Sequence, residues 1–197
     1  MKNKSFWMGL SISLILILVY QFIPSKADKK QLTEPFVLSL WDIGFVPSVS
    51  SNVINDFTFN MMKIDSEEAT LMPVQFSSFI GRPIILHFWA TWCGPCVEEL
   101  PSYDQFCKDS KVVNIAICSG KTPPLEVLKF CQPKGIKNVQ LSIDKNSLIM
   151  GRFRADGLPT SLFIDTKGRE IGRIVGPVQW GNPEISKLIE NLLLSRF

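Results

Sequence analysis

Residues 84–96 read IILHFWATWCGPC, and this stretch decides the fold. Its first part, Ile84 to Trp89, is short, apolar and rich in β-branched and aromatic residues, which predicts a buried strand. Two cysteines three positions apart, Cys93 and Cys96, follow it and open a segment with helical spacing. Unpaired N–H groups at a helix start stabilise a thiolate, so Cys93 is the expected reactive sulfur and Cys96 the more shielded one.

Two roles follow for this cysteine pair. Cys93 attacks a partner disulfide, and Cys96 resolves the mixed disulfide that forms. The alternatives are a static disulfide and half of a zinc site. A zinc site needs a second ligand pair at comparable spacing, and the other candidate ligands do not supply one. These are Cys107, Cys118, Cys131 and His87. Redox chemistry is therefore the favoured interpretation.

Strands and helices alternate around this motif. The predicted strands cover residues 84–89, 112–118, 139–143, 161–165 and 170–175. The predicted helices cover residues 95–108, 123–131, 147–153 and 183–194. Thr166-Lys167-Gly168 predicts a hairpin turn between the last two strands. Strand–helix–strand alternation implies parallel strands and the hairpin adds antiparallel ones, so the sequence predicts an α/β fold with a mixed sheet and helices on both faces.

The composition excludes several classes of protein. The chain has 197 residues, of which 46% are hydrophobic and 20% charged, which suits one domain with an appendage and excludes intrinsic disorder. His87 is the single histidine, so most metal clusters built on imidazole are excluded. Residues 56–197 hold 16 basic and 15 acidic side chains, and this balance gives no electrostatic footprint for nucleic acid.

The N-terminal segment predicts a membrane anchor. Residues 6–23, FWMGLSISLILILVYQFI, carry no charge and would span roughly 27 Å as a helix, close to the thickness of a bilayer core. Aromatic residues near both ends fit the two membrane interfaces. The run exceeds the roughly 7–15 residues of a signal-peptide core, so an uncleaved transmembrane signal anchor is favoured, with residues 1–5 as a cytoplasmic stub. Cleavage near Ser25-Lys26-Ala27 is the alternative.

The orientation of this anchor rests on chemistry more than on charge. Lysines lie on both sides of the apolar run, so the positive-inside rule gives little bias. We expect the chain to be a single-pass protein of the cytoplasmic membrane with its catalytic part on the extracytoplasmic, periplasmic side, because disulfide chemistry suits that side. Residues 24–55 are interpreted as a linker or extension that packs on the domain or on the membrane, and residues 56–197 as the domain.

The motif FWATWCGPC at residues 88–96 resembles the thioredoxin superfamily, and in particular its membrane-anchored, TlpA/ResA-like thiol–disulfide oxidoreductases. The resemblance extends from about Asp56 to the C-terminus. Residues 157–160, GLPT, resemble the cis-proline loop of that family, and Arg82 stands where the branch usually has a lysine. The resemblance implies a thioredoxin-like fold, with an insertion for which residues 121–139 are long enough.

The resemblance also gives roles to individual residues. Pro159 is expected to be cis and to lie against the cysteine pair. Glu99, three residues after Cys96, matches a carboxylate that this branch often carries and that is implicated in controlling cysteine protonation; a solvated surface acid is the alternative. His87 stands where cytosolic thioredoxins have a buried aspartate, and a neutral core histidine is favoured over a proton acceptor for Cys96. The catalytic candidates are thus both motif cysteines, Pro159 and Glu99.

The remaining cysteines and tryptophans are given structural roles. Inert buried thiols are favoured over a second disulfide for the other three cysteines. Trp92 is expected at the contact surface around Cys93, and Trp89 in the core. Trp180 matches a family position near the last helix and is interpreted as structural.

The function implied by the resemblance is reduction of disulfides in exported proteins by a membrane-tethered enzyme. Gly94-Pro95 between the cysteines resembles reducing thioredoxins, and the absence of a histidine there removes a charge that would stabilise the Cys93 thiolate. The branch implies apocytochrome c or copper-centre assembly proteins as substrates, and a membrane dithiol carrier of the CcdA/DsbD type as electron donor. No prosthetic cofactor is implied, since Val97 follows Cys96 and rules out a CxxCH haem site. The alternatives are a disulfide oxidase or isomerase, and a copper(I)-binding module that uses both thiolates.

Overall fold

The computed structural model describes residues 39–49, 52–65 and 68–194. The predicted anchor at residues 6–23, the stub before it and the first part of the predicted linker lie outside the described residues. Within the described part of the chain, no helix is both long and apolar enough to cross a bilayer.

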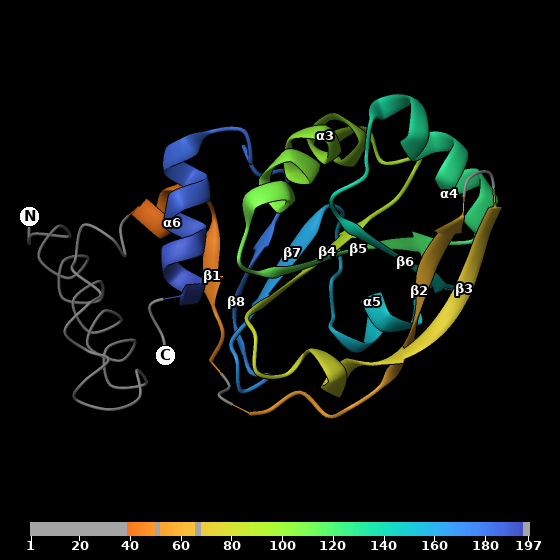
Figure 1. Ribbon diagram of the computed structural model, residues 1–197. Coiled ribbons are helices and arrows are strands. Elements are labelled where there is room, and N and C mark those ends of the chain that lie inside the picture. Colours follow the sequence, from red (N-terminus) through yellow and green to blue (C-terminus); the bar gives the residue numbers. More distant parts are fainter. Residues whose placement is uncertain (1–38, 50–51, 66–67, 195–197) are drawn as a thin grey trace, which may run out of the picture. The chain divides into compact units, whose positions relative to one another are not determined.

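Eight strands form one mixed sheet (Figure 1). They are β1 (Phe45–Pro47), β2 (Thr58–Asp65), β3 (Glu68–Gln75), β4 (Ile84–Trp89), β5 (Val113–Gly120), β6 (Gln140–Lys145), β7 (Thr160–Ile164) and β8 (Glu170–Val175). Their order across the sheet is β1-β8-β7-β4-β5-β6-β2-β3. β4, β5 and β6 run parallel, and the other neighbouring pairs are antiparallel. The predicted mixed sheet is therefore confirmed, and β4, the strand that leads to the cysteines, lies in its interior.

Within the described residues that follow β1, four helices and two short 3-10 turns lie between or after the strands. They are η2 (Phe76–Phe79), α3 (Gly94–Asp109), α4 (Pro124–Cys131), η3 (Gln132–Lys134), α5 (Leu148–Arg152) and α6 (Pro183–Leu194). The stretch expected to hold the insertion, residues 121–139, contains α4 and η3 between β5 and β6. Asp104 of α3 fixes this connection, because its carboxylate accepts hydrogen bonds from the backbone N–H groups of residues 137, 138 and 139.

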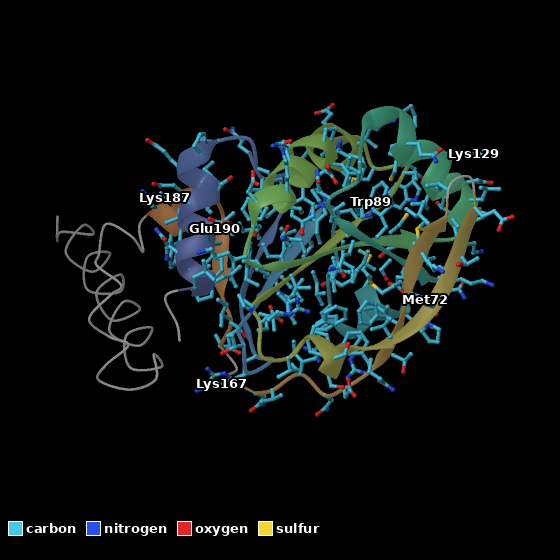
Figure 2. The ribbon with its side chains drawn as sticks, in the orientation of Figure 1. Met72, Trp89, Lys129, Lys167, Lys187 and Glu190 are labelled. Atoms are coloured by element: carbon cyan, nitrogen blue, oxygen red, sulfur yellow. A yellow bond between two sulfur atoms is a disulfide. The ribbon has the colours of Figure 1, made fainter. Side chains whose placement is uncertain are left out.

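Both faces of β4 are buried, which explains its unbroken apolar sequence. Alternate side chains of a strand point to opposite faces. Three of them enter a core that also contains side chains of η2 and the end of α5: Ile84, Leu86, Phe88, Phe76, Phe79 and Phe153. On the other face Trp89, labelled in Figure 2, lies 5.8 Å from the ring of Phe130 in α4. Helices therefore pack against both faces, as predicted.

The sequence did not predict the outer strands at either edge. β3 is exposed along nearly its whole length and contains Pro73, which is tolerated because an edge strand has an unpaired side. β1 lies within the predicted linker and pairs with β8, so this part of the linker joins the sheet of the domain. The pairing depends on Gly172, where a Cβ atom would collide with the ring of Phe45 and the carbonyl of Val46.

Candidate active site at the start of helix α3

The two motif cysteines form a disulfide with an S–S distance of 2.02 Å. Cys93 is the N-cap of α3, and its Sγ accepts a hydrogen bond from the N–H of Cys96 at 3.3 Å. The first N–H groups of a helix have no partner inside it, so they stabilise negative charge on this sulfur when the disulfide opens. Cys96 is fully buried, whereas Cys93 keeps 6% of its surface exposed. Cys93 is thus the sulfur that a partner reaches first.

A groove of about 590 Å³ opens beside Cys93. It is lined by Trp92, Cys93, Gly94, Pro95, Ser119, Ser147, Met150, Asp156, Gly157 and Leu158. Trp92 is 73% exposed, which agrees with its expected place on a contact surface. The Leu158–Pro159 peptide bond is cis, as the resemblance implied, and the loop before it forms one wall of the groove. The structure therefore brings this loop and Cys93 to the same opening.

Glu99 lies inside the protein, so the surface-acid alternative is wrong. The residue is 6% exposed, and its Oε2 accepts hydrogen bonds from the backbone N–H of Val178 at 2.6 Å and from Nε1 of Trp180 at 3.2 Å. Burial raises the pKa of Glu99 to about 7, because the loss of hydration outweighs the two hydrogen bonds that favour the carboxylate. Glu99 can therefore gain or lose a proton near neutral pH.

His87 faces Glu99 from β4. Its ring is fully buried, its Nδ1 lies 2.9 Å from Oγ of Ser161, and its Nε2 lies 3.5 Å from Oε1 of Glu99. Burial lowers the pKa of His87 to about 3, so the imidazole is neutral at pH 7 and the contact with Glu99 is not an ion pair. The interpretation of His87 as a neutral core histidine is confirmed.

The other three cysteines are free thiols outside this site. Burial raises the pKa of Cys118 to about 11 and that of Cys131 to about 12, and it raises the pKa of Cys107 further. A protonated thiol is a poor nucleophile, so these sulfurs are slow to react. Among the described residues, no three His, Cys, Asp or Glu side chains gather as a metal site.

Two contributions to the site were not predicted from the sequence. Trp180 is buried, which suits the structural role expected of it, but its donation to Glu99 was missed, because nothing in its local sequence indicates a carboxylate partner. Ser147 and Met150 line the groove although they lie about fifty residues beyond the cysteines. Only the parallel packing of β4, β5 and β6 brings the segment after β6 to this opening.

Comparison with known proteins agrees with this geometry. A family model described as Redoxin matches residues 48–191. The thiol–disulfide oxidoreductase ResA of Bacillus thuringiensis (strain Al Hakam) is 32% identical over 106 residues, which cover 52% of this chain and 60% of ResA. ResA of Oceanobacillus iheyensis is 33% identical over 116 residues, covering 58% of this chain and 59% of that protein. The chain thus spans about three-fifths of the length of these curated relatives.

A solved structure shares the fold. It is that of a secreted disulfide oxidoreductase of Mycobacterium tuberculosis, described as homologous to DsbE of E. coli. The TM-score is 0.54 at 20% sequence identity, and the match covers 68% of this chain and 93% of that one.

The raised pKa of Glu99 predicts a pH-dependent cost to stability. Between its ordinary pKa of 4.5 and its folded value of about 7, the folded protein binds more protons than the unfolded chain, so the free energy of unfolding falls as the pH rises. Glu99→Gln removes this fall. Urea unfolding of the oxidised protein at pH 5 and pH 8 measures this effect. The free energy of unfolding of the variant, relative to that of the wild type, should increase by about 2–3 kcal/mol from pH 5 to pH 8.

The control for this prediction is Glu98→Gln, since Glu98 is the exposed neighbour on the same helix. The free energy of unfolding of Glu98→Gln should change between pH 5 and pH 8 by the same amount as that of the wild type. Parallel curves for Glu99→Gln and the wild type would show that Glu99 has an ordinary pKa.

Proposed function

Because this chain belongs to the Redoxin family, within the thioredoxin superfamily, we propose that it is a thiol–disulfide oxidoreductase that acts through Cys93 and Cys96. The observation that carries the proposal is the Cys93–Cys96 disulfide at the N-terminus of α3, with Cys93 on the wall of an open groove. The names of the ResA relatives support it. Cys107, Cys118 and Cys131 lack this setting, since burial raises the pKa of each.

The proposed reaction has two steps of thiol–disulfide exchange. In the reduced enzyme the Cys93 thiolate attacks one sulfur of a substrate disulfide, and the other substrate sulfur leaves as a thiolate. Cys96 then loses its proton and attacks Cys93, which releases the second substrate thiolate and closes the enzyme disulfide. The substrate gains two electrons, and an external dithiol must return two electrons to the enzyme before the next cycle.

A trapping experiment tests this assignment. Cys96→Ser should accumulate a mixed disulfide through Cys93, because the resolving thiolate is gone, and its insulin-reducing activity should fall to near background. Mass spectrometry of the adduct identifies the sulfur involved. Cys93→Ser should form no adduct, whereas Cys118→Ser, which removes a buried thiol, should keep wild-type activity. Adducts that persist in Cys93→Ser would contradict the assignment of Cys93 as the attacking sulfur.

The same insulin assay tests the metal-binding alternative. Insulin reduction no faster than background by the wild type, together with tight uptake of one copper(I) ion, would favour that alternative.

We further propose that the enzyme works as a reductant. The Gly94-Pro95 pair between the cysteines supports this direction, because no cationic side chain lies between them to stabilise the reduced, thiolate form. The competing activity is net oxidation or isomerisation of protein disulfides. The two activities require different redox potentials, so the potential distinguishes them.

The midpoint potential against glutathione is expected near the value of about −270 mV typical of thioredoxin, and far below the value of about −120 mV of the oxidant DsbA. Pro95→His places a cationic group beside Cys93 and should raise the potential by about 30 mV or more. A wild-type value in the strongly oxidising range would contradict the reductive role and favour the oxidase.

The proposed location is the extracytoplasmic, periplasmic face of the cytoplasmic membrane, with residues 6–23 as the anchor. The length and uncharged composition of that run support the proposal. The proposed substrates are exported proteins with disulfides, such as apocytochrome c or copper-centre assembly proteins, and the proposed electron donor is a membrane dithiol carrier of the CcdA/DsbD type.

Labelling in intact cells tests the location. After mild reduction, a membrane-impermeant maleimide should modify the full-length protein at Cys93, and the labelling should disappear in Cys93→Ser. The protein should stay in the membrane fraction after a high-salt wash. Labelling of Cys93 only after the membrane has been permeabilised would place the domain in the cytoplasm.

A further inference from the structure

Two buried polar atoms on side chains that face each other lack hydrogen-bond partners. Among the described residues, Nε2 of His87 and Oε1 of Glu99 are both enclosed and both unpartnered, and they lie 3.5 Å apart. An unsatisfied buried polar atom costs free energy, so such atoms call for an explanation. The other polar atoms of the two side chains are satisfied, since Nδ1 of His87 meets Ser161 and Oε2 of Glu99 accepts from Val178 and Trp180.

One proton placed between these atoms would satisfy both of them, and it can come from either side. In the first arrangement Glu99 is a carboxylate, His87 carries its proton on Nε2 and donates it toward Oε1, and Nδ1 accepts from the hydroxyl of Ser161. In the second arrangement Glu99 is a carboxylic acid that donates to Nε2, and His87 carries its proton on Nδ1 and donates to Oγ of Ser161. The second holds one proton more than the first, and His87 is neutral in both.

We propose that His87 is a positioning residue that shares a proton with Glu99 and so determines when Glu99 can accept the proton of Cys96. The inference rests on the proposed function for its role in exchange. Glu99 follows Cys96 by three residues on α3, a spacing that places the two on one face of the helix, and both side chains are buried there. His87 approaches the carboxylate from β4, the strand that leads into the motif.

The proton balance of the resolving step follows. The proton on the Cys96 thiol moves to the Glu99 carboxylate, and the Cys96 thiolate attacks Cys93 and displaces the substrate thiolate. As Glu99 becomes an acid, His87 exchanges its Nε2 proton with solvent water for one proton on Nδ1, so the ring stays neutral; Nδ1–H then donates to Ser161, and Nε2 accepts the proton of Glu99. The tautomer of His87 therefore reports whether Glu99 is charged.

The groups around the pair leave Glu99 as the one that titrates near neutral pH. Tyr103 of α3 lies 4.6 Å from the His87 ring, between centroids, and burial raises its pKa well above its ordinary value, so it stays neutral. Ser161 of β7 and Trp180 before α6 are uncharged. Cys96, one turn earlier on α3, does not titrate while the disulfide is closed. Cys107 interacts with Tyr103, and burial raises its pKa as well.

Nitrogen NMR of the oxidised protein tests the proton sharing directly. His87 is the chain's single histidine, so a sample labelled with ¹⁵N-histidine and freed of any affinity tag gives one imidazole signal set. Between pH 5 and 9 the ring should stay neutral while its proton moves from Nδ1 to Nε2, with a midpoint near 7. Glu99→Gln should abolish the pH dependence. A single tautomer throughout, or a switch that survives in Glu99→Gln, would overturn the proposal.

The resolving step gives the second test. A mixed disulfide between Cys93 and thionitrobenzoate releases its chromophore when Cys96 attacks, and the rate should rise with pH as Glu99 becomes a carboxylate. His87→Phe removes a hydrogen-bond partner from both states of Glu99. The bond to the carboxylate is the stronger of the two because it involves a charged acceptor, so the rise should shift upward by about one pH unit. His87→Gln keeps an N–H donor and should restore the wild-type midpoint to within about half a unit. If His87→Phe folds and the midpoint of its pH–rate curve equals that of the wild type, the proposed role of His87 in the exchange reaction is overturned.

The two tests separate this inference from the proposed function. If His87→Phe does not fold, the NMR experiment on the wild type still decides whether the proton is shared. A tautomer switch in a protein that reduces no disulfide would refute the oxidoreductase and leave the proton-sharing pair intact. Normal disulfide reduction by a protein whose His87 keeps a single tautomer would refute the proton sharing and leave the proposed oxidoreductase intact.

Discussion

The N–H groups at the start of α3 have no partners inside the helix, and that of Cys96 is bonded to the sulfur of Cys93. This contact requires that the chain leave the sheet and begin a helix at one fixed place. β4 supplies that place, because it lies between β5 and β7 with both faces covered and cannot slide. The reactivity of one sulfur therefore depends on the packing of the central sheet.

The same helix start is tied to the C-terminal part of the fold through a buried carboxyl group. Glu99 accepts hydrogen bonds from Val178 and Trp180, which lie in the segment before α6. A neutral, apolar residue in this place would avoid the cost of burying a carboxylate. The chain instead keeps an acid whose ionised form destabilises the fold at neutral pH, and such a cost at a buried group next to a reactive centre is typical of a functional site.

The features that could be predicted from the sequence are those that depend on residues close together in the chain. The apolar run of β4 and the Cys93–Cys96 spacing predict the strand, the helix and the reactive sulfur, because each depends on neighbours a few residues away. The burial of Glu99 depends on a segment about eighty residues later, so the residue's position on α3 leaves open whether it faces solvent. The β2–β3 hairpin escaped prediction for a related reason: most of its outer strand is exposed, so it lacks a clear alternation of apolar and polar residues.

The proposed proton sharing gives a physical reason for a histidine at position 87. An aspartate at this position, as in cytosolic thioredoxins, would place two carboxyl groups close together in a buried site, and their repulsion would hold one of them protonated far above neutral pH. A neutral imidazole has no such charge, and it can donate to a carboxylate or accept from a carboxylic acid. His87, with Ser161 on its other nitrogen, can therefore accompany either state of Glu99 without leaving a polar atom unsatisfied. A neutral histidine is therefore a suitable neighbour for a buried acid that changes its protonation near neutral pH.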